Sequence, residues 1–159
     1  MGEALERLIG SPILVTFLIS MVPVVELRGA IPFGVSMGLP HWQAMAVAVV
    51  GNLVPVPFII LFIRRIFQWM REKLPKLGGL VDRLEAKAEK KRDLIVKWST
   101  LGLVLLVAVP LPGTGAWTGA LVAAMLDIRL KRAFPAITLG VLIAGLLVTG
   151  ITYGFTSIF

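Results

Sequence analysis

Four long apolar stretches dominate the pattern of hydrophobic and polar positions along the chain. They run through Ile13–Gly38, Trp42–Ile63, Leu94–Leu126 and Ala133–Phe159. Each is long enough to compare with the roughly 20 apolar residues that cross a bilayer as a helix. The pattern therefore predicts an all-α integral membrane protein.

The long polar stretch lies between the second and third apolar stretches. Eleven of the 16 Lys and Arg residues and five of the nine Asp and Glu residues fall within residues 64–97. Here Leu80, Leu84, Ala88 and Ile95 recur roughly at the spacing of one helix face, with charged residues around them. We expect an amphipathic helix that lies on the membrane surface.

Composition supports the membrane assignment and excludes several classes of protein. Hydrophobic residues make up 57% of the chain and charged residues 16%, which is more apolar surface than a soluble domain of this length buries. The absence of cysteine excludes disulfides, thiolate metal sites and cysteine nucleophiles. No catalytic constellation, metal site or cofactor site is visible, so an enzyme is not expected. The segment before Ile13 lacks the basic region of a signal peptide, so no cleaved leader is expected.

The basic residues also predict how the chain crosses the membrane. A second basic cluster, Arg129, Lys131 and Arg132, follows the third apolar stretch. If the third stretch enters the membrane and returns to the same face, this cluster and the 64–97 connector both become cytoplasmic, as the positive-inside rule favours. We therefore expect a multi-pass protein of the cytoplasmic (inner) membrane with both termini outside. The same rule accounts for the net charge of +7 without a nucleic-acid partner.

Prolines and glycines supply the bend that such a re-entrant hairpin needs. The third stretch contains "VPLPGTGAWTG" at residues 109–119, and in the first stretch two prolines bracket Gly29. A helix broken inside a bilayer exposes backbone polar groups, which is tolerated only where they face protein or a wet cavity. A simple proline kink is the alternative at either site. The predicted breaks are Pro23, Pro32, Pro110, Pro112 and Gly119.

The two halves of the chain carry these features in the same order. Val22-Pro23 precedes the first break and Val109-Pro110 the second, and Gly51 and Gly140 follow within the next apolar stretch of each half. The order predicts a single membrane domain, residues 1–159, with two inverted repeats. Each repeat is a re-entrant helical hairpin plus one spanning helix. The repeats cover 11–63 and 98–159, and the cytoplasmic connector 64–97 joins them. Secondary transporters have repeats of this kind, with binding sites near the membrane midplane at interrupted helices.

Two charged residues, Glu26 and Arg28, lie in the first break, within "PVVELRGAIP". An ionisable side chain near the bilayer centre costs roughly 2.5–3.5 kcal/mol on insertion scales, so both should face a protein-lined cavity. One interpretation is a mutual ion pair that fixes the hairpin. The functional interpretation is that Glu26 exchanges a proton, because burial raises the pKa of a carboxyl group, while Arg28 donates a planar pair of hydrogen bonds to an anion.

The second break offers backbone donors. Gly113, Thr114 and Gly115 precede a short helix predicted to begin near Ala116, and its N–H groups could face the same cavity as Arg28. Close helix packing is the alternative role for these glycines. Asn52 is the one strongly polar residue of the first spanning helix, and it would contact substrate or form an interhelical hydrogen bond. The remaining candidates for substrate contact are Gly29 and Trp117.

Two motifs carry a family resemblance. "ELRGAIPFG" at Glu26–Gly34 and "PLPGTGAWTGA" at Pro110–Ala120 resemble the family of small multidrug export membrane proteins, over nearly the whole chain. That family is similar to the wider DedA-type superfamily, which implies two oppositely oriented re-entrant hairpins and proton-linked translocation of lipids, including polyprenyl phosphates. The second hairpin lacks the acid of some relatives, which departs from a two-carboxylate proton relay. The motif positions are Glu26, Arg28, Gly29, Pro32, Pro110, Pro112, Gly113, Gly115, Trp117 and Gly119.

These observations leave three classes of function open. The first is proton-linked translocation of an anionic lipid or lipid phosphate, which Arg28 and the second-break glycines favour. The second is export of lipophilic cations, for which Arg28 would be a repulsive neighbour of Glu26. The third is a membrane-organising protein that transports nothing. The expected partners are a membrane lipid or lipophilic small molecule, protons and a second copy of the chain in a homodimer.

Overall fold

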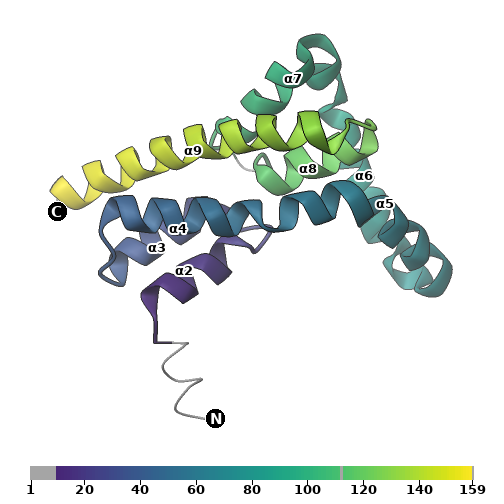
Figure 1. The fold of residues 1–159 in the computed structure, drawn as a ribbon. Helices are drawn as coiled ribbons and strands as arrows, with labels where there is room; N and C mark the ends of the chain where they lie inside the picture. The colour runs from purple at the N-terminus through teal and green to yellow at the C-terminus, as the bar shows by residue number, and fades with distance from the viewer. Residues whose placement is uncertain (1–9, 112, 159) are drawn as a thin grey trace. The chain divides into compact units, whose positions relative to one another are not determined.

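The computed structural model describes residues 10–111 and 113–158, which form eight α-helices and one short 3₁₀ helix (Figure 1). No strand occurs in these residues, so the all-α prediction is confirmed for them. The elements are α2 (Pro12–Ser20), α3 (Glu26–Ser36), α4 (His41–Leu53), α5 (Pro55–Lys73), η1 (Pro75–Leu77), α6 (Gly78–Lys90), α7 (Arg92–Ala108), α8 (Ala116–Met125) and α9 (Leu130–Ile158).

Among residues 10–111 and 113–158, two helical stretches are long and apolar enough to cross a membrane. The first, His41–Lys73, has 33 residues and consists of α4 and α5 with only Val54 between them. The second, Leu130–Ile158, is α9 and has 29 residues. They overlap the second and fourth apolar stretches of the sequence, the two that were predicted to span, but α5 continues past Ile63 to Lys73, into the predicted connector.

The first and third apolar stretches are interrupted. Helix α2 ends at Ser20 and α3 begins at Glu26, so residues 21–25, with Pro23, separate them. Helix α7 ends at Ala108 and α8 begins at Ala116, where the sequence predicted a short helix. Pro110 lies in this second interruption, and Pro112 lies outside the described residues.

Two of the predicted breaks are wrong, because Pro32 lies inside α3 and Gly119 inside α8. At Pro32 the helix loses only the hydrogen bond that an N–H would donate to the carbonyl of Arg28, and it continues through. Gly119 has a different role, because a side chain at this position would collide with α7. A Cβ at this position would lie 2.6 Å from Cγ2 of Val107, so the missing side chain lets α7 and α8 pack closely.

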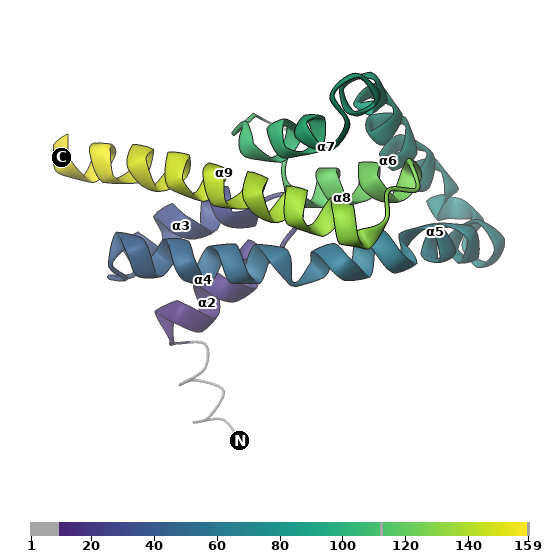
Figure 2. The ribbon, with the colours of Figure 1, turned by 45° about the horizontal axis from the view of Figure 1, so that its top comes forward.

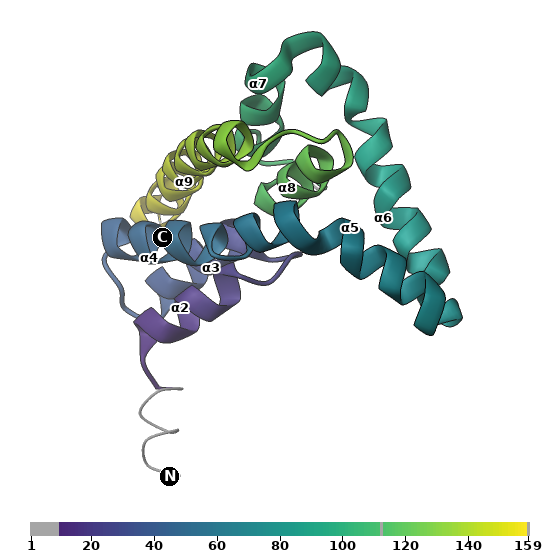
Figure 3. The same cartoon turned by 45° about the vertical axis from the view of Figure 1, so that its right-hand side comes forward.

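The chain forms two compact units. The described residues up to Pro55, together with those from Val141 onward, make the first, in which α2, α3 and α4 pack against one another (Figure 2). Val56–Gly140 make the second, in which α6 packs against α7 and α8 and leads directly into α7 (Figure 3). Each unit therefore contains one interrupted stretch and the start of the long helical stretch that follows it.

The polar connector departs from its predicted form in two details. Helix α6 ends at Lys90 and α7 starts at Arg92, so the amphipathic pattern is divided between two helices. On α6 the buried positions are Val81 and Ala88, whereas Leu80 is 50% exposed. The predicted stripe is thus displaced by one residue at its start, because the helix turns Val81 rather than Leu80 toward its neighbours.

In both units a glycine of the long helix packs against a backbone carbonyl oxygen of a neighbouring helix. A Cβ on Gly51 would lie 2.1 Å from Oγ of Ser20 and 2.6 Å from the carbonyl oxygen of Phe17. A Cβ on Gly140 would lie 2.6 Å from Cβ of Val107 and 2.9 Å from the carbonyl oxygen of Val104. In each unit a glycine of the long helix therefore lies directly on the helix that precedes the break.

Candidate functional site

Glu26 occupies the junction between the first break and α3. Its side chain is buried, with 4% exposure, and its N–H donates a hydrogen bond to the carbonyl of Val22 (2.9 Å). Its φ of 50° lies in the left-handed region, which is uncommon for a residue with a side chain and costs about 1–3 kcal/mol. Such strain persists where the surrounding structure fixes the residue, and it concentrates at functional sites. A buried carboxyl group at a strained helix start is the first part of the candidate site.

Arg28 follows on the first turn of α3 and is half-buried. It lies two residues after the buried Glu26. Arg28 lines a cavity of about 330 Å³, whose other walls come from α3 and the C-terminal part of α9. These walls are Pro32, Val148, Ile151, Thr152 and Phe155.

This cavity combines one charged side chain with largely apolar walls. The hydroxyl of Thr152 donates its proton to the carbonyl of Val148 (2.8 Å). Among the residues that line the cavity, Arg28 is therefore the donor that carries a charge, and the rest of the wall is largely apolar. A guanidinium group presents a planar set of N–H donors that matches a carboxylate or phosphate. Apolar walls beside it suit aliphatic chain rather than water.

The second break is shaped by two glycines with positive φ, Gly113 at 81° and Gly115 at 131°. Thr114 between them has its Oγ1 2.7 Å from the carbonyl oxygens of both Val109 and Leu111, so its proton is bonded within the turn. Gly115 is the N-cap of α8 and provides no side-chain hydrogen bond to the first helical turn. The N-terminal end of α8, the positive end of the helix dipole, therefore begins directly after the glycine turn.

Lys87 of α6 is a residue of this region that sequence reasoning missed. Its Nζ lies 3.5 Å from the position that a Cβ on Gly113 would take, and its Cε 3.2 Å. A positive charge therefore lies beside the glycine turn. The sequence alone provided no signal for Lys87, because nothing distinguishes it from the other basic residues of the connector.

Asn52 is 1% exposed, at the C-terminal end of α4. Neither its Oδ1 nor its Nδ2 has a hydrogen-bond partner among the described residues, so the interhelical hydrogen bond considered from the sequence is not formed there. Leaving a buried amide unpaired costs about 1–3 kcal/mol. Asn52 is therefore a polar group that a water molecule or a ligand could satisfy.

The remaining predicted residues divide between the two units. Glu26, Arg28, Gly29 and Asn52 belong to the first unit, and the 113–117 segment, with the half-buried Trp117, belongs to the second. Gly29 is half-buried, and a Cβ there would lie 2.3 Å from a methyl group of Val25. Because the two breaks lie in different units, the expectation that they share one cavity stays a prediction.

Comparison with protein families bears directly on these residues. Residues 26–147 match the model of the family described as "Putative small multi-drug export protein". The chain belongs to this family. The matched region begins at Glu26 and contains both motifs, Asn52 and Lys87, so the resemblance noted in the sequence is confirmed. No curated protein and no solved structure matches the chain.

Membership of the small multi-drug export family agrees with the two long apolar helices. Both point to a membrane location, and the family is named for export rather than for catalysis. The described side chains fit that description. They provide one buried carboxyl group, an arginine beside an apolar cavity and one turn shaped by two glycines.

Proposed function

We propose that this protein is a proton-linked membrane transporter that translocates an anionic lipid or lipid phosphate. In this proposal the site lies near the membrane midplane, at two re-entrant hairpins. Glu26 exchanges the proton, and Arg28 binds the anionic group. Gly29, Asn52, the Gly113–Gly115 turn and Trp117 complete the path.

The observation that carries the proposal is the cavity lined by Arg28. It combines one guanidinium group with apolar walls, and the buried Glu26 lies two residues before it. An anionic lipid has the same combination of chemistry, an acidic head and aliphatic chains. A carboxyl group close to the arginine allows competition, because protonation of Glu26 would free Arg28 for the anion and its deprotonation would favour release.

The order of elements supports the two repeats of the proposal. In each half a helix is followed by a break, a short helix, a turn with a positive-φ residue and a long helical stretch. The turn residues are Gly38 and Asp127, at φ 92° and 55°. The packing of the two glycines fits the same correspondence. Gly51 packs on Phe17 and Ser20, and Gly140 packs on the residues 87 positions later, Val104 and Val107. Two repeats joined by one crossing would be inverted relative to each other.

Export of lipophilic cations is the second candidate, because the family is named for multi-drug export. A buried carboxylate suits a cation, but Arg28 would repel it at the same cavity. The two candidates separate in one assay. The wild-type protein is reconstituted in vesicles with a pH gradient, and uptake of a short-chain fluorescent lipid phosphate is compared with uptake of a lipophilic cation. Gradient-dependent uptake of the cation without the lipid would refute our proposal.

Glu26→Gln is expected to leave the protein folded while removing the pH dependence of transport, because glutamine keeps the size and hydrogen bonding of glutamate but cannot ionise. The measurement is initial uptake rate against pH for the wild type and the variant. If Glu26 only pairs with Arg28, the variant would leave a charge stranded and lose several kcal/mol of stability. A large fall in Tm that accompanies the loss of transport would therefore favour the structural role.

The topology is expected to place both basic clusters on the cytoplasmic face. Because the chain has no cysteine, single reporter cysteines can be introduced without background. We expect Gly78→Cys and Leu130→Cys to react with an impermeant reagent from the cytoplasmic side, and Ser36→Cys from the outside. Labelling of positions 78 and 130 from opposite faces would make the third apolar stretch a true span and remove the inverted repeat.

A further inference from the structure

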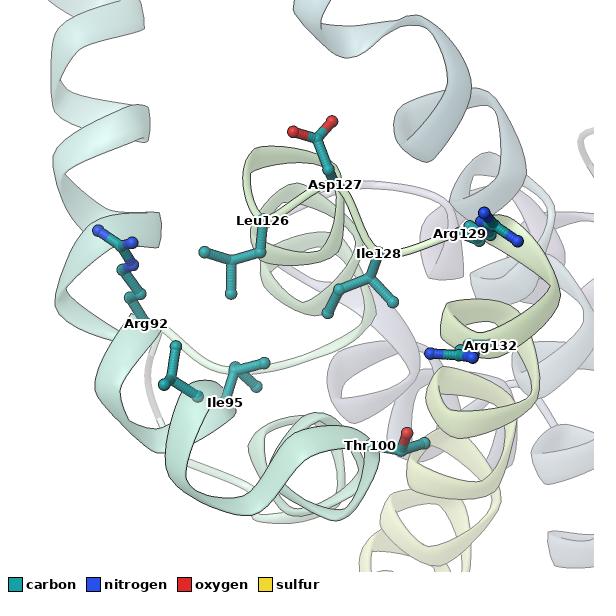
Figure 4. Close-up of a pocket in the computed structure, with 9 residues that line it drawn as sticks. Arg92, Ile95, Thr100, Leu126, Asp127, Ile128, Arg129 and Arg132 are labelled. Atoms are coloured by element: carbon teal, nitrogen blue, oxygen red, sulfur yellow. The ribbon is translucent and has the colours of Figure 1, made fainter.

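A further cavity lies entirely within the second unit and is lined by no residue of the first. It has a volume of about 600 Å³ and lies between α7 and the turn that leads from α8 into α9 (Figure 4). Figure 4 shows Arg92 on one side, Arg129 and Arg132 on the other, and Leu126, Ile128 and Ile95 between them. Three arginines thus surround an apolar centre.

The charge of this cavity is unbalanced. Its one acidic residue, Asp127, forms an ion pair with Arg64 of α5, and Arg92 pairs with Glu89 of α6 (3.0 Å). Arg129 and Arg132 form no ion pair with any residue that the structure describes. Two guanidinium groups at the rim are therefore available to an anion, and Arg92 is held by an exposed pair of a kind that contributes little.

The start of α9 adds to the same field. The carbonyl of Arg129 accepts the N–H groups of Arg132 and Ala133, both at 2.9 Å, so Arg129 is the last residue before the helix. The first turn of this 29-residue helix contains no acidic residue. The positive end of the helix and the two arginines therefore act on a ligand together.

The apolar lining decides what kind of anion fits. Ile95 is 3% exposed, and Leu126 and Ile128 are half-buried beside it. A fully hydrated anion gains nothing from such a surface, whereas the glycerol and upper acyl region of a lipid would bury apolar area there. Basic pockets beside membrane helices at the cytoplasmic side are suited to anionic lipid headgroups.

We propose that this pocket binds the phosphate group of an anionic membrane lipid, with Arg129 and Arg132 on the phosphate and Arg92 completing the site. This inference goes beyond the transport proposal and does not depend on it. The pocket contains neither Glu26 nor Arg28. A lipid at this site would fix the α8–α9 turn at the membrane surface.

The test measures binding to the full-length protein in a neutral detergent. The probes are short-chain phosphatidic acid, phosphatidylcholine with the same chains, and inorganic phosphate, and the readout is the affinity from a thermal-shift titration. All proteins carry Arg28→Ala, so that the hairpin site does not contribute. We expect phosphatidic acid to bind more tightly than phosphatidylcholine. We also expect Arg129→Gln/Arg132→Gln to weaken its binding about tenfold or more, since two charge-assisted contacts are lost.

A matched control removes the same charge elsewhere. Arg83→Gln/Lys90→Gln changes two exposed positions of α6 that line no part of the pocket, and it should bind phosphatidic acid like its parent. Arg129→Lys/Arg132→Lys keeps the charge without the planar donors, and should fold normally with intermediate affinity. This pair keeps the test valid if the glutamine variant is unstable.

Each outcome decides the proposal. Equal binding of phosphatidic acid by the glutamine variant and its parent would overturn it, and so would equal binding of phosphatidylcholine and phosphatidic acid. If inorganic phosphate binds as tightly as phosphatidic acid and is lost in the glutamine variant, the arginines bind phosphate but the source is soluble, and the lipid assignment fails. Binding of phosphatidic acid alone, with loss in the glutamine variant, supports it.

Discussion

Replacing Gly51 or Gly140 with alanine is expected to destabilise the protein by about 3 kcal/mol, which lowers Tm by about 6–12 °C. At both positions a Cβ would come within 3.0 Å of a backbone carbonyl oxygen, that of Phe17 or of Val104. A side chain can rotate away from such a contact, but a carbonyl in a helix cannot move without shifting the helix. The measurement is thermal unfolding of each purified variant in the same detergent.

Two glycines farther along α9, the helix that contains Gly140, provide the control. A Cβ on Gly150 or Gly154 of α9 would meet nothing within 4 Å. Gly150→Ala and Gly154→Ala should therefore be neutral or raise stability by up to about 1 kcal/mol, because alanine has the higher helix propensity. Equal effects at Gly51, Gly140 and Gly150 would show that packing against the preceding helix is not what the first two glycines provide.

A second substitution separates the two contacts at Gly51. In Gly51→Ala/Ser20→Ala the hydroxyl that lies 2.1 Å from the new Cβ is gone, but the carbonyl of Phe17 at 2.6 Å remains. The pair should recover only part of the lost stability. Full recovery would assign the whole effect to the side chain of Ser20.

Arg28→Ala is expected to reduce uptake of a lipid phosphate about a hundredfold or more, because a bidentate, charge-assisted contact in an apolar cavity is lost. Arg28→Lys keeps the charge but lacks the planar pair of donors, so we expect it to recover only a small part of this loss. Uptake into reconstituted vesicles gives both values. Arg83→Ala, at an exposed position of α6, is the matched control and should transport like the wild type.

The same variants distinguish lipid transport from cation export. If the substrate is a lipophilic cation, removal of the positive charge beside Glu26 should leave uptake intact or increase it. Folding must be compared first by Tm, although Glu26 can take up a proton when Arg28 is removed, which lessens the structural penalty. Unimpaired uptake of the lipid phosphate by folded Arg28→Ala would contradict the proposed function.

Much of the architecture could be predicted from the sequence because a bilayer limits the alternatives. Backbone polar groups inside it must be satisfied locally, so apolar stretches of this length become helices and dense proline and glycine marks their interruptions. The start of α8 at Ala116 followed from the glycines that precede it. Pro32 and Gly119 were misjudged because a single proline or glycine ends a helix only when no packing holds the helix together, and both lie in tightly packed helices.

Sequence by itself determined the helical class, the two long apolar helices, the family and the unusual position of Glu26 and Arg28 in an apolar stretch. Only the tertiary structure decided which side chains meet across sequence distance. It placed Arg28 against the end of α9, Lys87 beside the Gly113 turn, and Arg92 near Arg129 and Arg132. The pattern of apolar and polar residues indicates whether a segment prefers lipid or water. It does not indicate which side chains the segment contacts, because the burial of apolar surface is non-directional. The pairing of distant side chains depends on how helices pack, and no single segment carries that information.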